Sequence, residues 1–538
     1  MSEDKKSRWS RRDLLKGIAS VPIVGSVWWA GASKGVNNTQ ARDSILKTLN
    51  INASPPPPSG PMVGDPIRIG IIGFGIRGPQ LCRALGFGQK SWLESMAEAA
   101  KKNPKDTRLS SFLAQEHLNI HITAVCDLFD VRAQDAIDSF STDDVKVQRF
   151  RTHQELVESN VVDAVVIATP DHWHAPIAIA ALQAGKHVYV EKPMTHNIKE
   201  TYALKDAVEA SNVVFQVGHQ HRQTQSFLTA QDVVKKNILG HVSLIQANTN
   251  RNDDNGAWQY PIHEKANPNT IDWKQFIGNA PMVPFNSEHF FRWRKWWAYG
   301  SGLSGDLMSH DYDRVNCILK MGIPNSVVAS GGIYTHKDGR NVPDVMQVNM
   351  EFPDFSTGSS QLEGKEKGMT MVYSATLGNQ YGRTTAFMGH DATMEVGNSL
   401  TIYADGNSTK FKEKLVSEEM DPNVPIYQYD PASGSVDGVT SATAKYFADK
   451  GLLWTYRDGK RVDSTHLHVR EWLSCIRNGG TPSCNIKEGF EEAMTSHMGG
   501  LSYKLGRRID WDQAKQEIVP VKGYDLDEAL LEDKEKIV

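Results

Sequence analysis

The sequence predicts an α/β protein with a doubly wound parallel sheet in its first half and an α+β domain with an open, mainly antiparallel sheet in its second half. Two observations support this prediction. From residue 67 to about residue 220, apolar strand-like runs alternate with helical stretches, which is typical of a parallel sheet with helices on both faces. From residue 327 to about residue 456, Gly, Thr, Val and Tyr are frequent and apolar residues alternate with polar ones, as in antiparallel strands. The chain has 538 residues, 40% of them hydrophobic, so it can bury two cores.

The N-terminal segment resembles an export signal. The stretch Ser10–Lys16, with two adjacent arginines, resembles the twin-arginine signal, and it precedes an uncharged run at residues 17–32 that ends in small residues. We expect a signal or membrane anchor at residues 1–33, cleaved or retained, and a location in the periplasm or cell envelope. A short buried helix is the alternative. The proline-rich segment within residues 34–66 predicts an extended linker.

The first domain is expected at residues 67–220, with strands in IRIGII, ITAVCD, DAVVIAT, HVYVE and VVFQV. A glycine-rich turn follows the first of these strands and opens a helix. In such a turn the first glycine permits a tight bend, the second lets the backbone approach a pyrophosphate, and the third lets the helix pack closely on the strand. The pattern therefore predicts a Rossmann domain that binds a dinucleotide, rather than a turn with a structural role alone. Its residues are Gly73, Phe74, Gly75, Ile76, Arg77 and Gly78.

Asp127, at the end of the second predicted strand, is the candidate acceptor for the ribose hydroxyls of the cofactor. A carboxylate at this position repels a 2′-phosphate and favours NAD, while Arg132 nearby keeps NADP open. Asp127 lies about fifty residues after the glycines, where about twenty is usual. We attribute the excess to an insertion at residues 87–118. The alternative is a solvated aspartate at a strand end.

Further motifs resemble the Gfo/Idh/MocA family, which includes glucose-fructose oxidoreductase and inositol dehydrogenase. They occur in the family's order and are TPDHWH at residues 169–174, AGKHVYVEKP at 184–193, GDLMSHDYD at 305–313 and GRRIDWD at 506–512. The resemblance covers residues 67–512. It implies a nicotinamide-dependent oxidoreductase whose second domain, residues 221–520, binds substrate and pairs copies of the chain into a dimer or tetramer. Residues 521–538 are expected to form a charged, peripheral tail.

The resemblance also implies that Lys192 faces the nicotinamide and acts with Asp306 and His310, and that the Lys192–Pro193 peptide is cis. Asp306 and His310 are four residues apart, so on one helix they share a face and the carboxylate can orient the imidazole. A histidine with a pKa near about 6.5 exchanges protons at neutral pH, and burial can bring a lysine with a pKa of about 10.4 into a useful range. The alternative for Lys192 is an ion pair with Glu191.

Other residues are expected to complete the two binding regions. For the cofactor these are Thr169, Pro170, His174 and Glu191, together with Lys192, the glycine turn and Asp127. For the substrate they are Arg222, Trp297 and Tyr299, together with Lys192, Asp306 and His310. The aromatic and basic stretch at residues 289–299 suits a carbohydrate, because rings stack on sugar faces and arginine donates paired hydrogen bonds. For each tryptophan a buried strut between the domains is equally open.

Composition excludes several other classes. The net charge of -4 and the lack of a basic tract argue against nucleic acid as a partner. The five scattered cysteines predict neither a disulfide framework nor a zinc site. His219 and His221 alternate along one segment, but no acidic or cysteine ligand is close to them in the sequence, so no metal is predicted.

These observations favour an exported oxidoreductase that transfers hydride between a tightly bound NAD, or NADP, and a small carbohydrate or cyclitol. The cofactor should be tightly bound because no nicotinamide pool exists outside the inner membrane. A redox-neutral enzyme is the main alternative, cleaving or epimerising a glycoside through a transient 3-keto sugar. A carbohydrate sensor with a degenerate Rossmann domain is a further alternative, although the complete motifs count against it.

Overall fold

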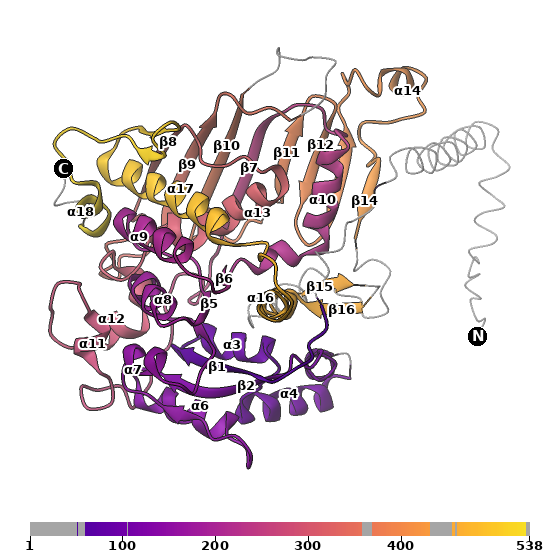
Figure 1. Ribbon diagram of the computed structural model, residues 1–538. Helices are drawn as coiled ribbons and strands as arrows, with labels where there is room; N and C mark the ends of the chain where they lie inside the picture. The colour runs from indigo at the N-terminus through magenta and orange to yellow at the C-terminus, as the bar shows by residue number, and fades with distance from the viewer. Residues whose placement is uncertain are drawn as a thin grey trace, which may run out of the picture.

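The computed structural model describes residues 51, 60–104, 106–357, 368–382, 384–430, 454–457 and 460–533. Two large sheets dominate it, one in each half of the chain (Figure 1). The predicted export signal and most of the predicted linker lie outside the described residues. Among the helices within those residues, none is both long and apolar enough to cross a membrane.

The first sheet is parallel throughout and has the strand order β3-β2-β1-β4-β5-β6, which confirms the doubly wound prediction. The order reverses between β1 and β4, which is where ligands bind in sheets of this kind. The strands are β1 Ile67–Ile72, β2 Ile120–Cys126, β3 Gln148–Arg149, β4 Ala164–Ile167, β5 His187–Val190 and β6 Phe215–Val217. β4 is buried along its whole length because helices cover both faces of the sheet.

Helices connect these strands. Helices α4 (Lys90–Lys102) and α5 (Arg108–Leu113) form the insertion that the long gap between the glycine motif and Asp127 predicts. The other helical elements of this half are α3 Arg77–Ala84, α6 Asp130–Phe140, α7 His153–Glu158, η1 Asp171–Trp173, α8 His174–Gln183, α9 Ile198–Glu209 and η2 Gln220–Gln223.

The second sheet has the order β14-β13-β12-β11-β7-β10-β9-β8-β17-β18. Only β7 and β10 pair in parallel, so the sheet is mixed and mainly antiparallel, as predicted. Its strands are β7 Val242–Asn250, β8 Ser326–Gly332, β9 Val345–Phe352, β10 Met369–Thr376, β11 Thr385–Gly389, β12 Ala392–Val396, β13 Leu400–Ala404, β14 Tyr427–Tyr429, β17 Ile509–Asp512 and β18 Glu517–Ile518. Strands β15 Trp454–Arg457 and β16 Lys460–Asp463 form a separate pair.

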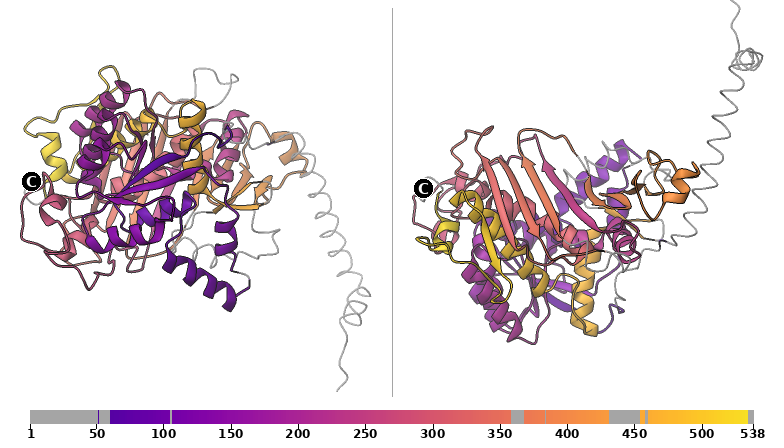
Figure 2. Two further views of the ribbon diagram at one scale, coloured as in Figure 1. Left: turned by 60° about the horizontal axis from the view of Figure 1, so that its bottom comes forward. Right: turned by 90° about the horizontal axis from the view of Figure 1, so that it is seen from above.

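Helices α10 (Gln225–Lys235), α13 (Ser309–Leu319) and α17 (Ile486–Leu505) cover one face of the second sheet (Figure 2). Alternate residues of β9 are buried, as expected of a strand with one covered face. The remaining helical elements are α11 Trp273–Ile277, α12 Ser287–Phe291, η3 Trp293–Lys295, the π-helical turn η4 Ser304–Met308, α14 Lys412–Val416, α16 Ser464–Asn478 and α18 Leu526–Leu531.

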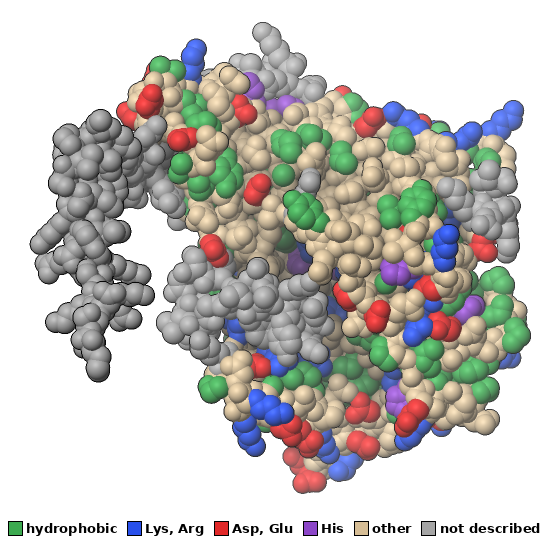
Figure 3. All heavy atoms as spheres, turned by 180° about the vertical axis from the view of Figure 1, so that it is seen from behind, with side chains coloured by type: hydrophobic (Ala, Val, Ile, Leu, Met, Phe, Trp, Pro, Cys, Tyr) green, Lys and Arg blue, Asp and Glu red, His purple; other side chains and the backbone are tan. Residues whose placement is uncertain are grey.

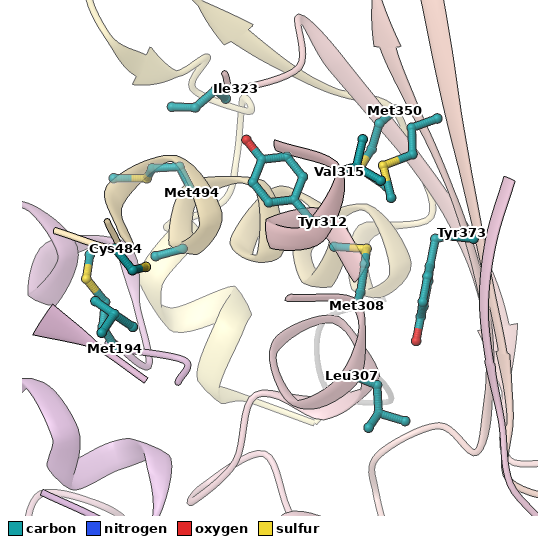
Figure 4. Packing of buried hydrophobic residues seen from close by; sticks show 14 of the residues in the cluster. Met194, Leu307, Met308, Tyr312, Val315, Ile323, Met350, Tyr373, Cys484 and Met494 are labelled. Atoms are coloured by element: carbon teal, nitrogen blue, oxygen red, sulfur yellow. The ribbon is translucent and has the colours of Figure 1, made fainter. Parts of the chain in front are cut away.

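Apolar packing in the core fixes two turns, the one before Met194 and the one at Asp306. Met194, which follows the EKP sequence, is fully buried with Cys484 and Met494 (Figure 4). Leu307 and Met308, which follow Asp306, belong to the same core. Both turns are therefore held by apolar packing on their C-terminal sides, and the charged residues just before these anchors are positioned by it.

Helix α16 returns to the first sheet although it belongs to the second half of the sequence. Its buried residues Val469, Trp472 and Leu473 pack in the same core as β1 and β2, and the Trp472 ring lies 5.8 Å from the ring of Tyr189 in β5. A 3.6-residue apolar period reveals such a helix, but not which sheet it covers.

The C-terminal segment is not peripheral, which corrects the expectation for residues 521–538 as far as residue 533. Ala529 and Leu530 of α18 are buried, and the helix contacts α17 and α9. The buried Lys504 amine donates hydrogen bonds to the carbonyl oxygens of Leu530 and Glu532, at 2.5 and 2.7 Å. Charged residues dominate the composition of the segment, but a short apolar face of α18 packs on the core.

Candidate active site

A cavity of about 470 Å³ lies between the carboxyl ends of the first sheet's strands and the second half of the chain. A site of this size and position is typical of small-molecule and cofactor binding in open α/β sheets. Among its lining residues are Gly73, Gly75, Ile76, Arg77, Asp127, Thr169, Pro170, His174, Glu191, Lys192, Asp306 and His310, all of which the sequence predicts as site residues. Phe74 and Gly78 belong to the same glycine turn but do not line the cavity.

The three glycines of the turn have different surroundings. Gly73 has φ of +88°, and a Cβ there would lie 2.6 Å from the Ala168 carbonyl oxygen; a Cβ on Gly78 would lie 2.4 Å from the Gly73 carbonyl oxygen. A Cβ on Gly75 would meet nothing nearer than Arg132, at 3.5 Å. Close packing thus requires the outer glycines, while the middle one leaves the backbone open to the cavity. This arrangement fits a dinucleotide pyrophosphate.

Asp127 lines the cavity and also holds the turn. Its carboxylate accepts hydrogen bonds from the backbone N–H groups of Phe74 (2.6 Å) and Phe129 (2.8 Å). Arg132 lines the same region, with its guanidinium 5.0 Å from the Phe291 ring. Burial lowers the pKa of Arg132, and the charge of Asp127 opposes the shift. An acid and a cation therefore both face the space that a ribose would occupy.

Glu191 pairs with Arg77 rather than with Lys192, the partner named in the alternative interpretation. The Arg77 Nε donates to the Glu191 carboxylate at 2.7 Å, and Arg77 Nη2 donates to Gln220 at 3.2 Å. Burial acts to raise the pKa of Glu191, but the charge and hydrogen bond of Arg77, together with the charges of Lys192 and His174, outweigh it and the pKa is lowered. The pair ties the glycine turn to the end of β5.

Lys192 is held by Asp306. Its Nζ donates to the backbone oxygen of Asp306 at 2.6 Å and to the carboxylate at 3.1 Å, and the Lys192–Pro193 peptide is cis as predicted. The same carboxylate accepts from Arg294 Nε (2.9 Å) and Trp258 Nε1 (3.1 Å). Burial acts to raise the pKa of Asp306, but the charges of Lys192 and Arg294 outweigh it, so the carboxyl is ionised.

The expected contact between Asp306 and His310 is wrong. Asp306 lies in the π-helical turn η4 and His310 in the α-helix that follows; both line the cavity, but among the described residues no hydrogen bond or ion pair joins their side chains. Asp306 orients Lys192 instead. His310 makes no hydrogen bond to the described residues, and its buried Nδ1 has no partner. Its ring contacts those of His219 and His221, with centroids 5.8 and 5.6 Å away.

The electrostatics of His310 also differ from the expectation. Burial lowers its pKa well below the usual value, and the charge of Lys192 lowers it further. The imidazole is therefore neutral at neutral pH. Protonation of this buried imidazole is energetically unfavourable, so it is not half-protonated near neutral pH.

His174 connects two of the motifs. Its Nδ1 lies 2.7 Å from the Pro193 carbonyl oxygen and its Nε2 lies 2.8 Å from the Thr169 carbonyl oxygen. It is 1% exposed, so its main contribution is to fix the loop after β4 against the EKP turn. Thr169 and Pro170 line the cavity, and the buried Thr169 hydroxyl has no partner among the described residues.

Three residues expected around the substrate do not line the cavity. Arg222 is 3% exposed and donates to Asp313 (2.8 and 2.5 Å) and to the Ser483 carbonyl oxygen (2.6 Å). Trp297 is buried and donates to the Asn341 carbonyl oxygen, and the hydroxyl of the buried Tyr299 lies 3.2 Å from His289 Nδ1. Each has its polar atoms satisfied in the interior, so these residues are structural struts.

Other residues of the same stretch take their place. Trp293 and Arg294 line the cavity, with the Arg294 guanidinium 4.1 Å from the Trp293 ring. The composition of residues 289–299 found this segment, but composition does not show which side chains turn inward. Gln220 and His221, from the segment at residues 219–222 that the family resemblance places beside nicotinamide and substrate, also line the cavity; Arg251, Tyr260 and Arg314 line it too, and no motif indicated them.

No cluster of three or more His, Cys, Asp or Glu residues suitable for a metal ion occurs within the described parts of the chain. His219 lies near the carboxylates of Asp313 (3.6 Å) and Glu492 (3.5 Å), whereas His221 Nε2 is 2.9 Å from Arg314. The two histidines therefore face different partners.

Comparison with known proteins identifies the class. Residues 67–219 match an oxidoreductase family with an NAD-binding Rossmann fold, and residues 270–510 match the C-terminal alpha/beta domain of the same family. Together the matches span well over half of the chain. The protein belongs to the Gfo/Idh/MocA oxidoreductase family.

Several characterised or curated proteins are similar to parts of the chain. Levoglucosan dehydrogenase of Pseudarthrobacter phenanthrenivorans is 30% identical over 250 residues, 42% of this chain and 56% of that protein. The scyllo-inositol 2-dehydrogenase (NADP(+)) of Bacillus subtilis is 24% identical over 199 residues, 37% of this chain and 45% of that protein. A glycosyl hydrolase family 109 protein of Shewanella sp. is 35% identical over 152 residues, 27% of this chain and 26% of that protein. The matches thus span about half, or less, of these relatives.

Solved structures share the fold at low sequence identity. Levoglucosan dehydrogenase in complex with NADH and levoglucosan superposes with a TM-score of 0.54 at 18% identity, over 83% of this chain and 99% of that chain. The WlbA dehydrogenase from Bordetella pertussis, in complex with NADH and UDP-GlcNAcA, gives 0.52 at 15% identity, over 86% and 100% of the two chains.

Proposed function

We propose that this protein transfers hydride between a tightly bound nicotinamide dinucleotide and a hydroxyl or ketone of a sugar, glycoside or cyclitol. One observation carries the proposal: Lys192 Nζ is held by Asp306 in a cavity that the glycine turn also lines. Trp293 and Tyr260 line the same cavity and provide aromatic faces suited to a sugar ring. The names of the levoglucosan and inositol dehydrogenases support a substrate of this class.

A nicotinamide dinucleotide held with its pyrophosphate at the glycine turn would supply the acceptor for the hydride that leaves the carbinol carbon. The residues of this chain manage the proton. An ammonium has three N–H donors, and Asp306 accepts two hydrogen bonds from Lys192, so one donor remains for a substrate oxygen. During ketone reduction Lys192 gives this proton to the carbonyl oxygen as the C–H bond forms.

In the oxidation direction the hydroxyl O–H breaks and the carbonyl forms, so a base must take the proton. The neutral imidazole of His310 lines the cavity and can take it, and by reversibility so can Lys192, the group that gives up this proton in ketone reduction. Asp306, already ionised and engaged with Lys192 and Arg294, positions the amine and does not exchange the proton itself.

Export by the twin-arginine route belongs to this proposal and rests on the motif at residues 10–16. An exported enzyme has no pool of free nicotinamide, so the cofactor would have to stay bound and be regenerated in place, for example by a second sugar. Pairing of two or four copies through the second sheet is also part of the proposal. Native mass and cell fractionation test these two points.

A second candidate is redox-neutral chemistry, in which transient oxidation of a sugar enables cleavage or epimerisation and the hydride then returns. The similarity to a glycosyl hydrolase family 109 protein favours keeping it. The two functions differ in their products. Net reduction of the cofactor by a sugar supports the dehydrogenase, whereas glycoside cleavage with no net change in cofactor absorbance supports the second candidate.

The decisive experiment begins by denaturing the purified protein and identifying the released nucleotide. The native enzyme is then mixed with sugars, glycosides, cyclitols and 3-keto-glycosides while the reduced-nicotinamide absorbance is followed. Lys192→Ala should keep the nucleotide and lose turnover. Lys199→Ala is the matched control, because the Lys199 side chain is 73% exposed and removing its surface ion pairs should change little. Unchanged turnover in Lys192→Ala would refute the assignment.

A further inference from the structure

Positive charge is in excess in the part of the cavity around Lys192. Four cations line this part: Lys192, Arg251, Arg294 and Arg314. Three carboxylates lie among them; one of these, Asp171, lines the cavity, accepts hydrogen bonds from Ser301 and acts on Arg294 and Lys192 through its charge. Asp306 binds both Lys192 and Arg294, and Asp311 binds Arg314 at 2.9 Å. His221 and His310 add no negative charge, so the described residues leave a net positive charge in this part of the cavity.

Arg251 is the cation without a partner. It follows the end of β7, and its backbone N–H is fixed by a hydrogen bond to Thr376, at 2.9 Å. Its guanidinium makes no hydrogen bond and no ion pair with any residue in the described ranges. Arg294 is engaged only in part, because its Nε binds Asp306 while no bond from its two terminal nitrogens to a described residue is present.

The two guanidinium groups line the same cavity as Lys192 and Asp306. Both act on the pKa of Tyr260, which burial raises and their charges lower, and both contribute to holding Asp306 ionised. Arg294 binds the Asp306 carboxylate that also holds Lys192, and Arg251 acts on the same carboxylate, so both belong to the Lys192 end of the cavity. A dinucleotide pyrophosphate at the glycine turn would not neutralise them.

The excess charge is local. On the face of the molecule shown in Figure 3, acidic and basic side chains are interspersed and form no large patch of one sign. An exposed arginine needs no partner because water solvates it. An arginine that loses water when a ligand fills the cavity does need one, since a desolvated and unpaired charge is strongly unfavourable.

We propose that the substrate is a sugar carrying an anionic oxyacid group, a carboxylate or a phosphate ester, and that Arg251 with Arg294 binds this group. The planar fork of a guanidinium donates paired hydrogen bonds to both kinds of group. The proposal rests on the function proposed above and narrows its substrate class. A neutral sugar would leave Arg251 desolvated without a counter-charge.

Matched sugars test the proposal. Glucose, glucuronate and glucose 6-phosphate, together with their galacto and manno counterparts, differ at C6 by a hydroxyl, a carboxylate and a phosphate. Binding of each to the nucleotide-loaded enzyme is measured by calorimetry, and turnover by cofactor absorbance. Within at least one series, an acid or phosphate should bind tenfold or more tightly than its neutral partner, and the better of the two identifies the anion.

Arg251→Gln should reduce this preference by about 10- to 100-fold, the value of a charge-assisted hydrogen-bonded pair. Arg507→Gln, which removes the same charge from an exposed position, should leave it unchanged. The bound nucleotide content serves as the control for folding. Neutral sugars that bind as tightly as the anionic ones, or a preference that survives Arg251→Gln, would overturn the proposal. If no sugar binds or turns over, the proposed function fails as well.

Discussion

Replacing Asp306 with asparagine removes the carboxylate that forms ion pairs with both Lys192 and Arg294 while keeping the shape of the side chain. The two cations, with side chains 8% and 25% exposed, are then left without their counter-charge. Removing one partner of a buried ion pair costs about 3–5 kcal/mol. Because both cations reach the cavity and its water, we expect a loss near the lower end, about 3 kcal/mol. Turnover should also fall by at least about 100-fold, since Lys192 loses a hydrogen bond that positions it.

The free energy of unfolding in urea, followed by circular dichroism, measures the first effect. Asp510→Asn is the control, because this exposed carboxylate pairs with Arg508 at the surface and should contribute less than about 1 kcal/mol. The folded pKa of Asp306 lies below its unfolded value, so its contribution is complete above about pH 4 and declines as the pH falls toward the folded pKa. Asp306→Asn with unchanged stability and turnover would show that the ion-pair network does not organise the site.

Two further outcomes follow from the same geometry. Burial and the charge of Lys192 lower the pKa of His310, so the pH profile of kcat/KM should show no limb due to His310 between about pH 6.5 and 8. Any acid limb due to His310 should fall below about pH 6.5 and vanish in His310→Gln. A limb near pH 6.5 that His310→Gln removes would contradict the assignment. Gly78→Ala should lower the free energy of unfolding, because the added Cβ would lie 2.4 Å from the Gly73 carbonyl oxygen. Gly75→Ala, whose added Cβ has its nearest neighbour at 3.5 Å, should keep that stability and weaken nucleotide binding. Unfolding and the content of bound nucleotide measure the two effects. If the two variants changed stability and nucleotide content equally, the assignment of Gly78 to close packing and of Gly75 to nucleotide approach would be wrong.

The fold was predictable because its signals are local. Alternating strand and helix patterns, a glycine turn between a strand and a helix, and period-2 alternation in the second half are each readable within a few residues. The long gap before Asp127 even predicted an insertion, which the structure places in α4 and α5. Short edge strands such as β3, with two residues, carry too few residues for such a signal.

The site was predictable where one motif carries the contact, or where the family resemblance joins two motifs, as it does for Lys192 and Asp306. Glu191 pairs with Arg77, which is 114 positions away, and no local pattern encodes that distance. The predicted contact between Asp306 and His310 failed for a different reason: the Asp306 carboxylate is bound by Lys192, Arg294 and Trp258, and a spacing of four does not show which partner a carboxylate takes. Within residues 289–299 the composition was informative, but burial divided Trp293 from Trp297, and burial depends on tertiary packing.

Helix α16 affects how far the first domain is a separable module. Residues 464–478 supply Trp472 to the core of a sheet whose strands all lie before residue 220. A recombinant exchange of nucleotide-binding modules between relatives, cut near residue 220, would therefore take the sheet without its covering helix and leave Tyr189 facing water. The heritable unit of cofactor binding in this chain is discontinuous, and a productive chimaera would have to transfer both segments together.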